Sequence, residues 1–228
     1  MKKNYKEAPY GRFHLMLYIC TVLGQISCGY ALGIAGTAVT QAQGKLGLTT
    51  FWVGLLGAGT LIGLAGSLVV GNIADKIGRS RLFVFDMPLF ALFSILQLFT
   101  SNVGVLMILR ICIGLCIAVE YTVGTTIISE WFSPEDGPIF LSRFIIFWTF
   151  GYVASFFAGI IFASSVIPGV IAAISRFVIG VPESPTWLAS VNRLDDANKL
   201  ISEKLGDEYC VVEEPEERND KVSVKELF

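Results

Sequence analysis

Two charged residues within one long apolar run carry the most unusual chemistry of this sequence. Arg110 and Glu120 both fall in the stretch from about Val105 to Ser129. A charge at the centre of a bilayer costs at least ~2.5 kcal/mol on insertion scales, so such residues mark sites of charge pairing or proton exchange. Burial disfavours the charged form of a carboxyl group, which makes Glu120 a candidate proton carrier. The two side chains are about ten positions, or ~15 Å, apart along one helix, so we expect no direct pair between them.

Three uncharged residues in other apolar runs are candidates for a water-filled path. Gln25 and Tyr30 lie in the first run, and Trp148 lies in the fifth. Polar groups inside a membrane span face protein or a water-filled cavity. Gln25 and Tyr30 could equally form hydrogen bonds between helices, and Trp148 could simply pack against a neighbouring helix. The sequence leaves both interpretations open.

The residue types needed for catalysis or metal binding do not occur together. The lone histidine, His14, lies near the edge of the first apolar run and is interpreted as a bystander. The five cysteines do not have the spacing of a metal site. No basic patch interleaved with aromatic residues indicates nucleic-acid binding. We therefore expect no catalytic residue, no metal, no cofactor and no nucleic-acid partner.

The elements that must position these residues are membrane helices. The chain has 228 residues, of which 54% are hydrophobic and 16% are charged, whereas soluble domains carry nearer ~25% charged residues. Its mean hydropathy is +0.65. The apolar residues gather in runs of about 20, the length that crosses a bilayer as a helix. The predicted fold class is therefore an all-α membrane protein, with a bundle of six transmembrane helices.

The predicted organisation has four parts. Residues 1–12 form a short cytoplasmic lead, and residues 13–181 hold the six spans, which are expected at about 13–38, 51–70, 82–100, 105–129, 139–162 and 166–181. Residues 182–206 contain an amphipathic helix over 186–205 that ends at Gly206. Residues 207–228 form an acidic tail. Residues 41–50 are expected to form an external loop.

A short basic stretch between the second and third spans fixes the orientation. It runs from Gly71 to Arg81 and is expected to be a tight connector with three basic residues. Basic connectors lie on the cytoplasmic side of a membrane, so both termini are predicted to be cytoplasmic. Asp86 and Arg176 fall near the same side. We expect Asp86 to reach water there, and Arg176 to reach it by extending its side chain to the interface.

The same stretch resembles a known signature. The pattern Gly71-x-x-Ala-Asp75-Lys76-x-Gly78-Arg79-x-Arg81 is similar to the loop between the second and third helices of major facilitator superfamily transporters. Two further motifs occur in the expected order. Arg110-Ile-Cys-Ile-Gly114 with Ile128-Ser129-Glu130 resembles the fourth helix of the sugar porters and their metabolite:proton symporter relatives. Pro182-Glu183-Ser184-Pro185, followed by Thr-Trp-Leu, resembles the motif after their sixth helix.

The resemblance covers almost the whole chain, but only the N-terminal, six-helix half of a twelve-span transporter. It implies secondary active transport of a small polar metabolite, a sugar or an organic acid, coupled to protons and operating by alternating access. It implies a multi-pass protein of the cell inner membrane and no enzyme activity. The implied partners are the small-molecule substrate, protons, the lipid bilayer, and either a second half-transporter chain or another copy of this one.

The resemblance also assigns roles to residues. Arg110 and Glu120 would be the proton-coupling groups. In proton-coupled relatives this arginine pairs with an aspartate that follows Gly-Tyr in the first span, where this chain has Ala31. The implied cytoplasmic gating motif consists of Gly71, Asp75, Lys76, Gly78, Arg79, Arg81 and Glu130.

Two alternatives to a complete transporter half remain. A truncated remnant without transport activity is favoured by Ala31 and by the short link, Ser164-Ser165, between the fifth and sixth spans. A half-transporter that works as a homodimer predicts a stable dimer in detergent and saturable uptake.

Overall fold

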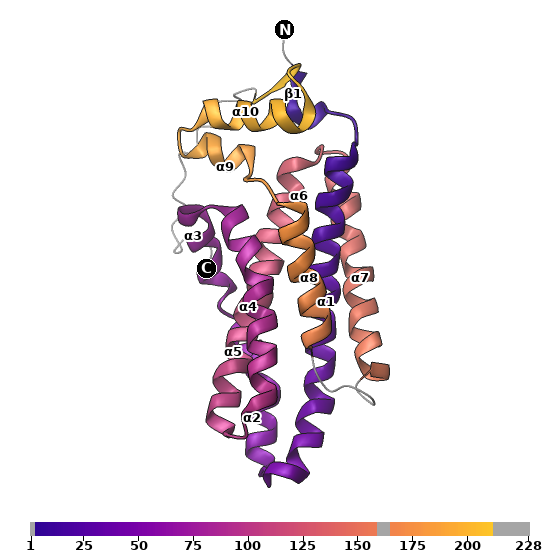
Figure 1. The fold of residues 1–228 in the computed structure, drawn as a ribbon, viewed down its shortest axis with the longest axis vertical. Coiled ribbons are helices and arrows are strands. Elements are labelled where there is room, and N and C mark those ends of the chain that lie inside the picture. Colours follow the sequence, from indigo (N-terminus) through magenta and orange to yellow (C-terminus); the bar gives the residue numbers. More distant parts are fainter. Residues whose placement is uncertain (1–2, 159–164, 212–228) are drawn as a thin grey trace, which may run out of the picture.

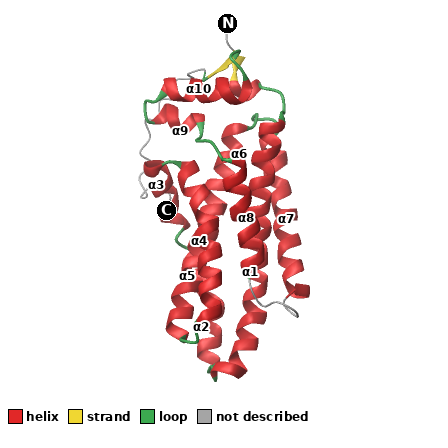
Figure 2. Cartoon of the chain, viewed as in Figure 1, coloured by secondary structure: helices red, strands yellow, loops and turns green. Residues whose placement is uncertain are grey.

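Helices make up nearly all of the part of the chain that the computed structural model describes, residues 3–158 and 165–211 (Figure 2). In chain order the elements are β1 (Lys3–Asn4), η1 (Tyr5–Glu7), α1 (Arg12–Leu46), α2 (Thr50–Leu64), α3 (Ser67–Ile77), α4 (Arg79–Phe99), α5 (Val103–Val119), the π-helical turn η2 (Glu120–Gly124), α6 (Thr125–Trp131), α7 (Gly137–Ala158), α8 (Val166–Ile179), α9 (Pro185–Ser190), α10 (Leu194–Leu205) and β2 (Tyr209–Cys210).

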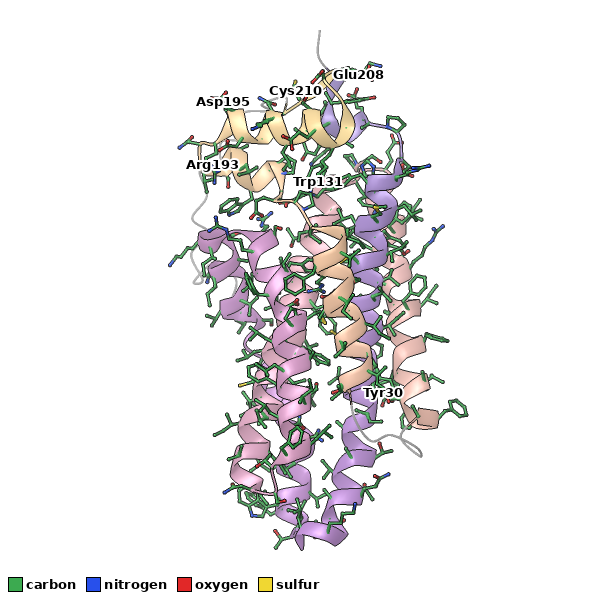
Figure 3. All side chains as sticks on the ribbon, viewed as in Figure 1. Tyr30, Trp131, Arg193, Asp195, Glu208 and Cys210 are labelled. Carbon is green, nitrogen blue, oxygen red and sulfur yellow. The ribbon has the colours of Figure 1, made fainter. Side chains whose placement is uncertain are left out.

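The helices form a long bundle with a small layer across one end. Figure 1 shows α9 and α10 lying across the end of the bundle where α1 begins and α6 ends. The chain start joins this layer, because β1 pairs in parallel with β2 and the Lys3 amide donates to the Glu208 carbonyl at 2.9 Å. Figure 3 shows Arg193, Asp195 and Glu208 gathered in this layer, whereas Tyr30 lies far down α1. Charged groups therefore concentrate at one end of the molecule.

Five helical segments among the described residues are long and apolar enough to cross a membrane. They are Arg12–Leu46, Thr50–Ile77, Arg79–Phe99, Val103–Trp131 and Gly137–Ala158. The predicted all-α membrane bundle is thus confirmed. The sixth predicted span is present as the shorter apolar helix α8, which has 14 residues. The predicted end of the fifth span at Phe162 and most of the link to the sixth lie outside the described residues, as does the acidic tail from residue 212.

The outer surface of the bundle is apolar, as a lipid-facing surface must be. Large hydrophobic side chains are exposed on most of the long helices, among them Leu68, Phe99, Ile145, Phe157 and Val178. Backbone polar groups cannot be left unpaired in hydrocarbon, and helices satisfy theirs internally. The surface and the secondary structure therefore both fit a bilayer.

Three predicted boundaries are wrong. The first helix does not end near Ala38 but continues to Leu46, because residues 41–45 are mostly good helix formers and Gly47 then stops the helix with a φ of 61°. The basic connector is mostly helical, and the turn between α3 and α4 is Gly78 alone, at a φ of 110°. The amphipathic segment is two helices, since Asn192 adopts a φ of 60° between α9 and α10.

Two glycines bring α2 and α5 into backbone contact. A Cβ on Gly63 would lie 2.1 Å from the carbonyl oxygen of Ile111, and one on Gly114 would lie 2.1 Å from that of Thr60. Small residues permit such close approach between membrane helices. Gly59 and Gly63 of α2, one helical turn apart, therefore lie on a helix crossing, and this crossing holds the segment that carries Arg110 against α2.

Candidate functional site

A buried ion cluster lies where α4, η2 and α8 meet. Arg176 of α8 forms ion pairs with Asp86 of α4 and with Glu120, the first residue of η2. The side chains of Arg176 and Glu120 are fully buried, and that of Asp86 is 1% exposed. The Arg176 guanidinium also donates to the Phe83 carbonyl, and its central carbon lies 3.7 Å from the centroid of the Phe83 ring. We call Asp86, Glu120 and Arg176 the buried ion cluster.

The cluster corrects two predictions. Asp86 and Arg176 do not reach water, because each finds its opposite charge inside the bundle. A charge that is paired in place has no need to extend to the interface. The sequence showed both residues in apolar runs, but their pairing depends on helix packing between segments about 90 positions apart. Arg176 is therefore a candidate functional residue that the sequence reasoning missed.

The charges within the cluster do not balance. Two carboxylates face one guanidinium, so the cluster carries a net charge of −1 when all three groups are ionised. Glu120 Oε1 and Asp86 Oδ2 have no hydrogen-bond partner in the part of the chain that the structure describes. Buried polar atoms are usually hydrogen-bonded, and an exception calls for an explanation. One proton shared by the two acids would neutralise the cluster and give one free oxygen a hydrogen to donate.

The backbone at Glu120 is also irregular. Residues Glu120–Gly124 form a π-helical turn inside an otherwise α-helical span, and such turns occur frequently at functional sites. Helix α1 passes directly beside it, because a Cβ on Gly24 would lie 2.4 Å from Glu120 Oε1. Glu120 thus sits where four segments of the bundle converge.

A second group of charges lies at the end of the bundle beneath α9. Arg79 pairs with Asp75, one turn earlier, at 3.0 Å and with Glu130 at the end of α6. Glu130 also accepts a hydrogen bond from the Ser184 hydroxyl. Residues from all three sequence motifs therefore meet at Glu130. Lys76 and Arg81 are exposed, and Gly71 has open space around its α-carbon.

The Pro182–Pro185 motif connects the layer of α9 and α10 to this group of charges. Glu183 Oε1 accepts the Ser80 amide at 2.8 Å. Its other carboxylate oxygen would lie 2.6 Å from a Cβ at position 78, so the glycine leaves room for it. Ser184 accepts the Trp187 amide at 3.2 Å, and the Trp187 indole donates to the Asp75 carbonyl at 2.9 Å. Pro185 begins α9 just after this cap.

The N-terminal lead also contacts Glu130 and the start of α9. The Tyr5 hydroxyl donates to the Glu130 carbonyl at 3.0 Å and lies 2.9 Å from Thr186 Oγ1. Burial raises the pKa of the Tyr5 hydroxyl, so it keeps its proton at neutral pH. Nothing in the twelve-residue lead singled out Tyr5. We call Arg79, Glu130 and Ser184, with the Tyr5 contact, the latch.

The three candidates for a water-filled path differ in burial, since Gln25 and Tyr30 are buried and Trp148 is partly exposed. Within the bundle, the Gln25 amide nitrogen has no hydrogen-bond partner among the described residues. Trp148 is partly exposed, donates to the Tyr121 hydroxyl and stacks on Tyr152 with ring centroids 5.3 Å apart. Trp148 thus makes the packing contacts of the simpler interpretation, and a role in a path stays a prediction for all three.

Residues 21–206 match the Major Facilitator Superfamily, and the chain belongs to this superfamily. It is 34% identical over 235 residues to the inner membrane metabolite transport protein YgcS of Escherichia coli K12, covering 97% of this chain and 52% of that protein. It is 26% identical to the arabinose-proton symporter of Bacillus subtilis, over 97% of this chain and 52% of the symporter. The chain thus spans about half the length of these relatives.

Solved structures show the same fold. The structure of the proton:xylose symporter XylE bound to 6-bromo-6-deoxy-D-glucose matches with a TM-score of 0.72 at 16% identity, over 86% of this chain and 50% of XylE. An inward-open structure of XylE from E. coli matches with a TM-score of 0.70 at 17% identity, over 85% of this chain and 52% of that one. The bundle therefore has the fold of half a superfamily member.

Proposed function

We propose that this chain forms one six-helix wall of a secondary transporter for a small polar metabolite, a sugar or an organic acid, in the cell inner membrane. Superfamily membership supports this proposal, as do relatives whose names state metabolite transport and proton symport. Transporters of this kind have two six-helix halves with a substrate site between them near the middle of the membrane. The layer with α9 and α10 faces the cytoplasm, so the latch sits at the cytoplasmic end.

Coupling to protons is the second part of the proposal, and the buried ion cluster is the observation that carries it. Adding or removing one proton changes the charge of the cluster between 0 and −1. The cluster joins α4, η2 and α8, so its charge state biases how these helices pack. A bound proton shifts the equilibrium between two conformations only to the extent that it binds one of them more tightly than the other. Glu120 is the proton carrier in this proposal, and its ion-pair partner is Arg176 rather than Arg110, the second coupling group that the resemblance implies.

Replacing Glu120 with glutamine tests proton coupling. The variant keeps the shape of the side chain but cannot exchange a proton. In liposomes with a pH gradient, acidic outside, we expect the wild type to accumulate substrate and Glu120→Gln to lose gradient-driven accumulation at least tenfold. Exchange of labelled substrate without a gradient should persist, because that process needs no net proton movement. The assay is run over a panel of sugars and organic acids.

Glu135→Gln is the matched control. Glu135 is exposed in the loop before α7 and makes no ion pair among the described residues. It should behave as the wild type. Undiminished gradient-driven accumulation by Glu120→Gln would contradict the coupling role of Glu120.

The second wall of the site is a second six-helix half, supplied by a second copy of this chain or by another segment or chain. The mass of the purified chain in mild detergent distinguishes these arrangements. A discrete dimer with saturable uptake supports a homodimer. A monomer that transports only with a second half supports the separate half. A chain that transports in neither setting would contradict the transport proposal.

A further inference from the structure

Arg110 lies against a small cavity in the part of the bundle far from the latch. It is 8% exposed and belongs to α5. The cavity measures about 40 Å³, and its polar lining consists of Arg110, Thr60, Ser94, Gln97 and Ser165. Roughly 10–15 Å³ is enough for one water molecule. The cavity therefore has room for a small ion or for the end group of a larger one.

The Arg110 guanidinium has no counter-ion in the described residues 3–158 and 165–211. No ion pair or hydrogen bond reaches it. The acids of the bundle are already engaged, since Asp86 and Glu120 pair with Arg176, and Asp75 and Glu130 pair with Arg79. Residues 159–164 contain no acid in the sequence. A buried charge left unpaired is strongly destabilising, so an anion from elsewhere would stabilise this site.

Ala31 explains why the space beside Arg110 is open. It lines the same cavity and is 6% exposed. Its methyl group brings neither charge nor bulk. The Ser94 and Ser165 hydroxyls lie along the same wall and are hydrogen-bonded to each other at 2.8 Å, so one of the two can turn its proton toward an anion. The cavity thus presents a cation and several neutral donors, but no acceptor with a negative charge.

We propose that this cavity binds a small monovalent anion, with the Arg110 guanidinium as its main ligand. The planar donor fork of arginine matches the two oxygens of a carboxylate. The same site can take a free inorganic anion such as chloride. If the carboxylate belongs to the transported molecule, the site selects organic acids over neutral sugars. That last step rests on the proposed transport function, whereas anion binding itself does not.

Direct binding of radiolabelled acetate and radiolabelled chloride to the purified full chain tests the proposal. We expect saturable binding at about one anion per chain. Arg110→Gln should weaken it at least tenfold. Ala31→Asp should weaken it to the same extent while keeping Arg110, because the new carboxylate occupies the guanidinium. Arg143→Gln, which changes an exposed arginine of α7, should leave binding unchanged.

The outcomes separate the two anion sources. Acetate binding that excess chloride does not displace identifies a carboxylate site, and tight chloride binding that displaces acetate identifies an inorganic anion site. The absence of binding to folded wild type would overturn the proposal. Undiminished binding by Ala31→Asp would also overturn it, even if Arg110→Gln failed to fold. Binding is measured without a gradient, so failure of proton-driven uptake leaves this result unaffected.

Discussion

Replacing Arg176 with leucine is expected to destabilise the bundle by roughly 3–5 kcal/mol, which is the cost of breaking a buried ion pair by removing one partner. Arg176 is fully buried and neutralises two acids at once. Without it, Asp86 and Glu120 are left in an apolar interior with no opposite charge. The measurement is the unfolding free energy of the purified chain in detergent, obtained from a denaturant titration in which circular dichroism reports the helix content.

The triple variant Arg176→Leu, Asp86→Leu, Glu120→Leu separates unpaired charge from lost packing. Replacing a whole buried charge cluster with apolar residues is often neutral or stabilising. The triple variant should therefore recover most of the stability that the single variant loses. Arg143→Leu, at an exposed position, should stay near the wild type. A single Arg176→Leu variant as stable as the wild type would show that the pairs contribute nothing.

The second large effect is expected at the latch. Glu130→Gln removes the charge that pairs with Arg79 and accepts from Ser184. A hydrogen bond to a charged group contributes roughly 1.5–3 kcal/mol. If the contact between α9 and the start of α4 loses about 2 kcal/mol of stabilising free energy, the protection of amides there against hydrogen exchange should fall about 30-fold. Hydrogen exchange read by mass spectrometry measures this change by segment.

The change should be local to the latch. Protection within the spans around the buried ion cluster should stay the same, because Glu130 does not contact Asp86 or Arg176. Glu135→Gln, five residues further along the chain, is the control and should leave α9 protected. Equal protection of α9 in Glu130→Gln and the wild type would mean that the latch does not hold the layer.

Much of this architecture can be predicted from short stretches of the sequence. Apolar runs of span length and the order of three motifs were enough to predict an all-α bundle of a transporter half. These signals act over short distances along one helix. The position of Glu130 close to other motif residues could also be predicted, because the resemblance placed Arg79 and Glu130 at the same end of the fold.

The pairing of the buried charges could not be predicted in the same way. Asp86, Glu120 and Arg176 come from three segments, and whether they face one another depends on the rotation of each helix in the bundle. Asp86 and Arg176, taken alone, also had a simpler explanation, which was contact with water at the membrane edge. Helix ends were misplaced for a related reason. The polar turns of α1 beyond Ala38 and the single-residue turn at Gly78 depend on backbone conformation rather than on hydrophobicity.

The exchangeable proton of the buried ion cluster can be observed directly by infrared spectroscopy. A protonated carboxyl group in an apolar site has its own C=O stretching band, separate from that of a carboxylate. The purified chain is titrated with pH in lipid, and the spectra of the wild type, Glu120→Gln and Asp86→Asn are compared. We predict a titrating carboxyl band in the wild type that is lost or shifted in Glu120→Gln. A cluster whose two acids stay ionised throughout the pH range in which the chain is folded would contradict the proposed coupling site.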